Sequence, residues 1–388
     1  MSDIAVQRHR EISDHCDELL SEFVDRLFGN LSRTDQRNRS REYVTGLLTT
    51  PGKKSLRRMA AAVSDSPHTS QALQQFVNVS PWDWRPVRHA LAEWVEQRRA
   101  TTVWGLEVAA IPKRGEHSAG VHRRAAAGTD GGVNCQLGIG LFLASAELCV
   151  PVDWRLVLPG RWQSDGAWRA AARIAEDEVT PAEGACALDL VRARTRATRR
   201  RGIPVVVDLT RVPHDAMFLS GVAALGTGFV AQISGDTVLH PPAGNRGPVF
   251  ARQLLRGAPE LPESGAGVVA GAPGHGPSRV WTCVVRLAVG TSTGRRRPCR
   301  VIVEHPAREH RAPRYFLTDL TYHQPVDVLA LADTADRTRA TVRRLRDHFG
   351  LADFEGRSYP GWHHHMTLMS AAYAFGCLTA TGTDSRAA

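Results

Sequence analysis

The sequence lacks long hydrophobic runs. None of its apolar stretches approaches the roughly 20 residues that a membrane-spanning helix needs. The first ten residues are polar, and no apolar core of a signal peptide follows them. We therefore expect a cytoplasmic protein that does not cross a membrane.

Cysteine is sparse and scattered. Seven cysteines among 388 residues include no Cys-x-x-Cys pair, so the sequence indicates neither a disulfide framework nor a zinc knuckle. With 43% hydrophobic and 23% charged residues, the composition excludes a disordered chain. The length is sufficient for two or three domains with a sizeable core.

Lysine is scarce beside arginine, but the two together outnumber the acidic residues. They total 49 against 39 Asp and Glu, which gives a formal net charge of +10. Such an excess fits a polyanionic partner such as nucleic acid. A genome rich in GC also favours arginine codons, so the distribution of the charges is more informative than their sum.

Residues 1–100 are predicted to form a helical, DNA-binding domain. Apolar residues recur at helical spacing from Ile12 to Phe28 and from Tyr43 to Leu48, and strand patterns are nearly absent. A solvated helical face or contacts with DNA phosphates would explain the basic residues of this region equally well. The candidates for DNA contacts here are Lys53, Lys54, Arg57 and Arg58.

From residue 101 the pattern changes to short β-branched runs. Runs at 102–108, 119–123 and 133–143 predict three strands in an antiparallel meander. A helix predicted over 185–200 leads into the apolar strand Val205–Asp208, which places a carboxylate at the edge of a buried sheet. With a further strand at 229–233, residues 101–235 are assigned to the first part of an α/β domain.

The region 236–320 is predicted to be an insertion rich in β structure. Its Pro/Gly-rich stretch from Pro241 to Ser278 is too long for an ordinary loop. Strands are predicted at 280–289, 300–303 and 314–317. The last part, 321–388, completes the α/β domain with helices over 326–349 and 366–378.

Several motifs in the same order resemble those of bacterial insertion-sequence transposases of the DDE type. The segments Asp353–Ser358 and Gly361–Leu368 are similar to the C-terminal signature of that family, which contains Gly-Trp-His-His-His. The segments Val133–Gly138 and Pro151–Leu156 are similar to its third strand and the segment after it. Pro112–Gly115 resembles the turn that follows its first catalytic aspartate.

The resemblance implies an RNase H-like fold, which is a mixed sheet with flanking helices. It also implies cleavage and transfer of strands of double-stranded DNA. In such a site three carboxylates hold two Mg²⁺ (or Mn²⁺) ions about 4 Å apart, which activate the attacking oxygen and stabilise the leaving oxygen. Carboxylate oxygens suit these hard cations.

The acidic residues of this chain depart from the family's pattern. Counting from the motifs places Glu107 at the first catalytic aspartate and Asp208 at the second, and both are candidate metal ligands. The third acid should fall near position 339, where this chain has Arg339. A guanidinium there would pair with the two carboxylates and oppose Mg²⁺ binding. Asp336, one helical turn earlier, is an alternative ligand.

Basic residues outside the N-terminal domain extend the predicted DNA surface. On the late helix, residues 339, 343 and 346 share one face. The candidates are Lys113, Arg114, Arg343, Arg346 and Arg357. The triplet His363–His365 cannot bind one ion, because neighbouring helical residues diverge by about 100°. A structural role or a contact with the DNA backbone is expected for it, and a core position for Trp362.

Three hypotheses follow. The first is a transposase-like DNA-binding protein whose strand cleavage is impaired or lost, with no cofactor. The second is an active transposase in which Glu107, Asp208 and Asp336 bind the metal ions. The third is a structural or interaction protein that no longer binds DNA. A homodimer is compatible with all three, and the sequence does not fix the oligomeric state.

Overall fold

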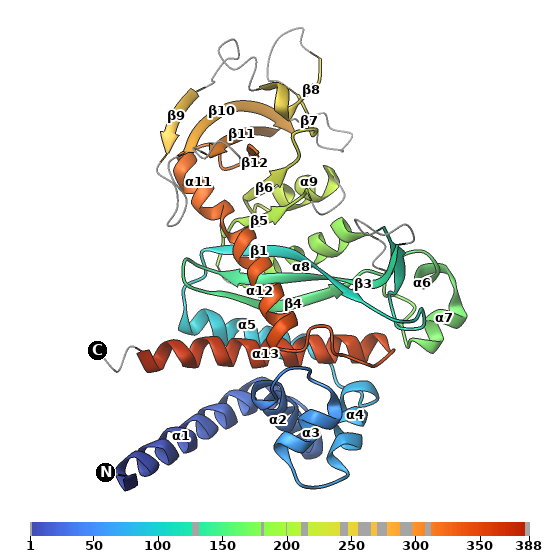
Figure 1. The fold of residues 1–388 in the computed structure, drawn as a ribbon. Coiled ribbons are helices and arrows are strands. Elements are labelled where there is room, and N and C mark those ends of the chain that lie inside the picture. Colours follow the sequence, from blue (N-terminus) through green and yellow to red (C-terminus); the bar gives the residue numbers. More distant parts are fainter. Residues whose placement is uncertain are drawn as a thin grey trace.

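The computed structural model describes residues 2–125, 132–179, 182–198, 200–210, 216–240, 247–254, 265–269, 278–287, 297–306 and 312–384. None of the helices within these ranges is long and apolar enough to cross a bilayer. The chain folds into a base of helices below a large twisted sheet (Figure 1).

The N-terminal region is helical, as the apolar spacing predicts. Its helices are α1 (Ser2–Phe28), α2 (Thr34–Thr49), α3 (Leu56–Val63), α4 (Thr69–Asn78) and α5 (Trp84–Arg98). Their apolar faces bury residues such as Leu27, Leu47 and Leu73 in a common core. At the start of α5, the Asp83 carboxylate accepts a hydrogen bond from the Arg85 amide, which satisfies one free donor of the first turn.

The centre of the molecule is one mixed sheet of ten strands in the order β2-β3-β1-β5-β6-β12-β11-β10-β9, with β4 paired to β3. These strands are β1 (Val103–Pro112), β2 (His122–Arg124), β3 (Val133–Ala144), β4 (Cys149–Leu156), β5 (Val205–Asp208), β6 (Phe229–Ile233), β9 (Gly265–Val269), β10 (Ser278–Leu287), β11 (Arg297–Pro306) and β12 (Arg314–Thr318). The short strands β7 (Val238–Leu239) and β8 (Val249–Phe250) form a separate pair, next to the 3₁₀ turn Ala251–Gln253.

The strands β4-β3-β1-β5-β6 form an RNase H-like core, which confirms the fold expected from the motifs. Strands β1, β5 and β6 are parallel, whereas β3 is antiparallel to both β1 and β4. All four residues of β5 are buried, as expected for a central parallel strand.

The predicted antiparallel meander is wrong. In a meander the second strand would lie in the middle, but here β3 is the central strand and pairs with β1 on one side and with β2 and β4 on the other. Residues 119–121 precede the strand, which begins at His122. The local pattern identified strands without identifying their neighbours.

The β-rich region after β6 continues the central sheet. Strand β12 pairs with β6, and β11, β10 and β9 follow in antiparallel order. Much of the Pro/Gly-rich stretch predicted as an insertion (241–246, 255–264 and 270–277) lies outside the described residues.

Helices cover the sheet on both sides (Figure 1). They are α6 (Arg161–Ser164), α7 (Gly166–Ala171), α8 (Glu183–Ala197), α9 (Ala216–Ala224), α11 (Pro325–Ala332), α12 (Thr334–His348) and α13 (Tyr359–Asp384). The helix predicted over 326–349 is divided at Asp333 into α11 and α12. Helix α13 is longer than predicted, and it packs between β4 and the helices α2, α4 and α5.

Candidate functional site

Glu107 and Asp208 lie side by side on the neighbouring strands β1 and β5. The parallel register of β1 and β5 pairs Leu106 with Val207, so the next residue on each strand is one of the two acids. Because side chains alternate along a strand, both acids occupy the face opposite to Leu106 and Val207. Both are buried, and Glu107 Oε1 accepts a hydrogen bond from the Val108 amide at 3.2 Å.

Helix α12 lies directly over this face. A Cβ atom on Gly105 would come within 2.4 Å of Thr338 Cγ2, so the glycine is needed for the close approach of α12 to β1. Thr338 is itself buried, and the next residue along the helix is Arg339. The packing of α12 thus brings position 339 to the carboxyl end of β5.

Arg339 forms an ion pair with Asp208. Its Nη2 donates to Asp208 Oδ2 at 2.6 Å, and the aspartate side chain is only 6% exposed against 28% for the arginine. The other carboxylate oxygen, Oδ1, accepts from the Thr210 amide at 3.0 Å and from the Thr210 hydroxyl at 2.6 Å. Both oxygens of Asp208 are therefore bound within the protein.

Asp336 is held by the same arginine. Arg339 Nη1 donates to Asp336 Oδ1 at 2.6 Å, so the guanidinium bridges Asp336 and Asp208. The second oxygen of Asp336 lies 3.6 Å from Arg314, which also pairs with Glu304 at 2.6 Å. Asp336, the alternative metal ligand considered from the sequence, is thus a half-exposed side chain that is paired with the guanidinium of Arg339.

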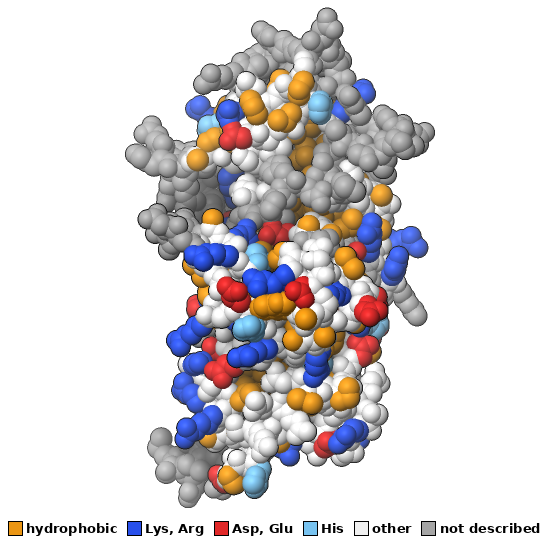
Figure 2. Space-filling model, turned by 90° about the vertical axis from the view of Figure 1, so that its right-hand side faces the viewer, with side chains coloured by type: hydrophobic (Ala, Val, Ile, Leu, Met, Phe, Trp, Pro, Cys, Tyr) orange, Lys and Arg blue, Asp and Glu red, His pale blue; other side chains and the backbone are white. Residues whose placement is uncertain are grey.

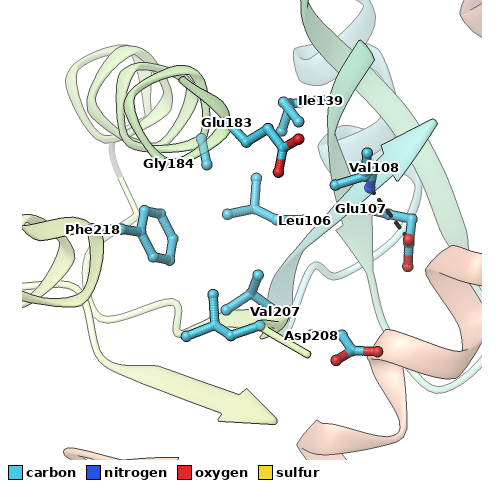
Figure 3. Close-up of a pocket in the computed structure, with 11 residues that line it drawn as sticks. Leu106, Glu107, Val108, Ile139, Glu183, Gly184, Val207, Asp208 and Phe218 are labelled. Carbon is cyan, nitrogen blue, oxygen red and sulfur yellow. Dashed lines mark hydrogen bonds between the residues drawn. The ribbon is translucent and has the colours of Figure 1, made fainter. Parts of the chain in front are cut away.

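A third acid, Glu183, lines the same pocket as Glu107 and Asp208 (Figure 3). It enters from the first turn of α8, across apolar side chains that include Phe218. Arg124 pairs with it at 3.2 Å, and burial raises the pKa of its carboxyl group. The motifs did not identify Glu183, although an acid at the start of a predicted helix is a recognisable signal.

The pocket does not fit the metal ions that the family resemblance implies. In the ranges that the structure describes, no three His, Cys, Asp or Glu side chains gather closely enough to hold one metal ion. Asp208 Oδ2 is paired with the guanidinium of Arg339, which comes from α12, the helix expected to carry the third acid. A fixed positive charge at this distance opposes a divalent cation.

The triplet His363–His365 is structural. The two ring nitrogens of His364 lie 2.9 Å from the carbonyls of Val77 and Trp82, and the single N–H of the neutral ring donates to one of them. His365 bonds Tyr43 Oη and the Gly350 carbonyl at 2.9 Å. All three rings are buried, which leaves no room for a DNA backbone. They diverge as predicted, and Trp362 is a core residue.

Two lysines predicted to contact DNA have internal partners. Lys54 is buried and its ammonium donates to the Thr50 carbonyl. Lys113 donates to the Phe354 carbonyl at 2.6 Å, and burial lowers the pKa of this lysine to about 8. Both act within the fold, because each ammonium faces a backbone carbonyl.

The other basic candidates are exposed, and two of them, Arg57 and Arg357, line one groove. A groove of about 520 Å³ between α3, α4 and the segment 353–358 is lined by Arg57 and Arg357, neither of which has a charged partner in the described ranges. Lys53 is at its margin and pairs with Glu355 at 3.2 Å. Arg346 on α12 donates to the Ala110 carbonyl at 2.7 Å. The remaining candidates, Arg58, Arg114 and Arg343, are exposed.

Figure 2 shows one face of the molecule, with Lys and Arg side chains spread among Asp and Glu. The charges on this face do not merge into one continuous patch of a single sign. A DNA surface must therefore be assigned to particular residues, and net charge alone does not locate it.

Comparisons with known proteins give one family. A family model described as DDE superfamily endonuclease matches residues 26–268, more than half of the chain. No curated protein matches. Among solved structures, the chain is similar to a piggyBac transposase synaptic complex with hairpin DNA, at a TM-score of 0.43 and 9% identity, over 95% of this chain and 74% of that chain. That likeness is too low to transfer a function.

Proposed function

Because the chain belongs to the DDE superfamily endonuclease family, we propose that it is a transposase-like protein that binds double-stranded DNA and has lost strand cleavage. The observation that supports the loss is the 2.6 Å ion pair between Arg339 and Asp208. It replaces a carboxylate by a cation where the family's third acid is expected.

The chemistry of the site favours this proposal. Two-metal catalysis requires acids that share the ions, whereas Asp208 here shares its oxygens with a guanidinium, a hydroxyl and an amide. Glu107 carries one methylene more than an aspartate, which shifts its oxygens by over 1 Å, and such displacement can cost about 10²-fold in rate. The scaffold remains suited to holding DNA while the cleavage step is impaired.

A nicking assay tests the loss of cleavage. The full chain is incubated with Mg²⁺ or Mn²⁺ and with supercoiled DNA carrying the sequences that flank its gene. We expect no more nicked product from the natural protein than from Asp208→Ala. Reproducible nicking that disappears in Asp208→Ala would overturn the proposal and favour the active alternative. Loss of that nicking in Asp336→Asn would then identify Asp336 as the third ligand.

A further inference from the structure

A second pocket lies away from Asp208, between α5, β4 and α8, and encloses about 220 Å³. One face of α5 lines it, since Arg88 and His89 follow Arg85 by three and four residues, and Ala92 follows these two by four and three. The alanines of the lining are too small to fill the space between the helices.

Four arginines line this pocket with a single carboxylate, that of Asp153. Three of the four have an acidic partner within 2.8 Å. Arg85 pairs with Glu178 at 2.7 Å, Arg88 with Asp153 at 2.8 Å and Arg194 with Glu96 at 2.6 Å. The fourth arginine, Arg155, is the remaining cation.

Arg88 serves the fold. Its guanidinium donates to Asp153, to Thr367 and to the carbonyls of Trp154 and His363 at 2.7–3.0 Å, and its fifth N–H faces His363 Nδ1 at 3.1 Å. These bonds join α5 to β4 and α13, and they leave no donor for a ligand. Any ligand must therefore be bound by the other arginines.

Arg155 forms only a long ion pair within the described residues. Its nearest carboxylate oxygen belongs to Asp153, at 3.8 Å, and Arg88 already holds that oxygen. Its hydrogen bond to the Trp154 carbonyl is long, at 3.5 Å. The side chain is only 19% exposed, so its charge is poorly compensated by water.

Arg194 supplies a second, independent indication. Its side chain is 6% exposed and lines the pocket, yet its Nε has no hydrogen-bond partner among the residues described. A buried donor without a partner destabilises the fold, because it has lost its hydrogen bonds to water. A bound anion would remove that destabilisation and balance the charge of Arg155.

We propose that this pocket binds a phosphate group, with Arg155 and Arg194 as its ligands. The planar guanidinium presents N–H groups in a fork that matches phosphate oxygens. The group has two chemical sources, which are a free phosphate compound and the 5′-phosphate at the end of a DNA strand. The site is separate from the Asp208 pocket and does not depend on the metal chemistry of the family.

Thermal unfolding of the full chain tests the proposal. Inorganic phosphate, compared with chloride at equal ionic strength, should raise the melting temperature of the natural protein. Arg155→Gln should weaken phosphate binding about tenfold or more, because a charge-assisted contact is lost. Arg196→Gln, which removes an exposed arginine from the same helix α8 outside the pocket, should bind phosphate like the natural protein.

The variant Ala197→Leu separates binding from folding. Ala197 is exposed at the end of α8 and lines the pocket, so leucine should obstruct it without altering charge. Phosphate stabilisation should fall in this variant while the melting temperature in chloride is kept. No stabilisation of the natural protein, or equal phosphate affinity in the natural protein, Arg155→Gln and Ala197→Leu, would overturn the proposal.

Two oligonucleotides distinguish the sources of the group. If the ligand is a DNA end, a 5′-phosphorylated strand should bind more tightly than the same strand with a 5′-hydroxyl, and Arg155→Gln should abolish the difference. Equal binding of the two strands, with phosphate stabilisation retained, assigns the pocket to a free phosphate compound. Phosphate binding is measured without DNA, so its failure is distinct from failure of DNA binding.

Discussion

At the residue scale, Arg339 pairs with the carboxylate of Asp208 and so opposes the binding of a metal ion by this group. The aspartate is buried at the end of a parallel strand, where a carboxylate needs a partner. The arginine provides it within the fold, so the charge of Asp208 is balanced by a side chain of the protein. Removing one partner of such a pair leaves the other uncompensated.

A double-mutant cycle measures this coupling. Asp208→Asn should lower the free energy of unfolding by about 1–3 kcal/mol, and Arg339→Gln should rescue part of that loss. Asp336→Asn is the matched control, because its side chain is 52% exposed and the exposed pair should contribute less than about 1 kcal/mol. Urea unfolding without divalent ions provides the values. Additive effects of Asp208→Asn and Arg339→Gln would contradict the coupling.

The buried histidines give stability a defined pH dependence. Burial lowers the pKa of His364 and of His365 to about 4, against about 6.5 in the unfolded chain. The unfolded state therefore binds more protons between these values, and stability is complete above pH 6.5 and falls toward pH 4. From pH 7 to pH 5 we expect a loss of about 2 kcal/mol per histidine.

Urea unfolding at pH 7 and pH 5 checks the histidines. His365→Gln keeps a polar side chain without a titrating ring, so the loss between the two pH values should shrink by one histidine's share. His117→Gln is the control, because His117 is exposed and stacks on Trp168. An unchanged slope in His365→Gln would show that this ring does not contribute.

Sequence predicted the place of these residues better than their contacts. The motif order identified Glu107, Asp208 and position 339, which the fold brings together at β1, β5 and α12. Lys54 was predicted to contact DNA, but its ammonium turns to Thr50. A sequence shows which side chains are charged, but the direction of a long side chain such as that of Lys54 depends on the packing around it.

At the element scale, the fit between α12 and β1 determines the site. The two elements meet at Gly105 and Thr338, one residue before Arg339. The positions of most helices and of several strands were predictable from periodicity, although strand ends were not, since β11 spans Arg297–Pro306 against a prediction of 300–303. The contact between Gly105 and Thr338 joins residues more than 200 positions apart and leaves no local signal. The wrong meander has the same origin, since pairing partners of β3 are not encoded in its own pattern.

Gly105→Ala should separate α12 from the sheet. The new Cβ would lie 2.4 Å from Thr338 Cγ2, and overpacking of this kind costs about 1–3 kcal/mol. Adding Thr338→Ser removes the clashing methyl group and keeps the hydroxyl that donates to the Ala335 carbonyl. Urea unfolding should show recovery in the double variant. If the free energy of unfolding does not recover, the loss in Gly105→Ala comes from the backbone of β1 and not from the clash with Thr338.

At the scale of the whole molecule, the basic groove between α3, α4 and residues 353–358 joins the N-terminal helices to the C-terminal signature. Lys54 contacts Asp353 through its amide at 2.7 Å, and Lys113 reaches the same segment from the end of β1. Exposed Arg57 and Arg357 both line the groove. Residues distant in sequence thus form one surface, and this surface is where the proposed binding of DNA is tested.

Salt dependence tests that surface. The logarithm of DNA affinity should fall linearly with the logarithm of salt concentration, by about 0.9 for each phosphate neutralised. Arg57→Gln with Arg357→Gln should reduce the slope by about 2. Arg26→Gln on α1, away from the groove, should leave it unchanged. A flat salt titration of the natural protein would exclude phosphate contacts and favour an interaction protein.

The position of α13 has a consequence for synthesis of the chain. This helix is synthesised after the first hundred residues and the sheet, yet its His364 contacts the carbonyls of Val77 and Trp82, and it packs along β4. The first hundred residues and the sheet therefore emerge before the element that joins them. A nascent chain stopped before Tyr359 exposes both apolar surfaces, which makes incomplete products natural substrates for chaperones and proteases.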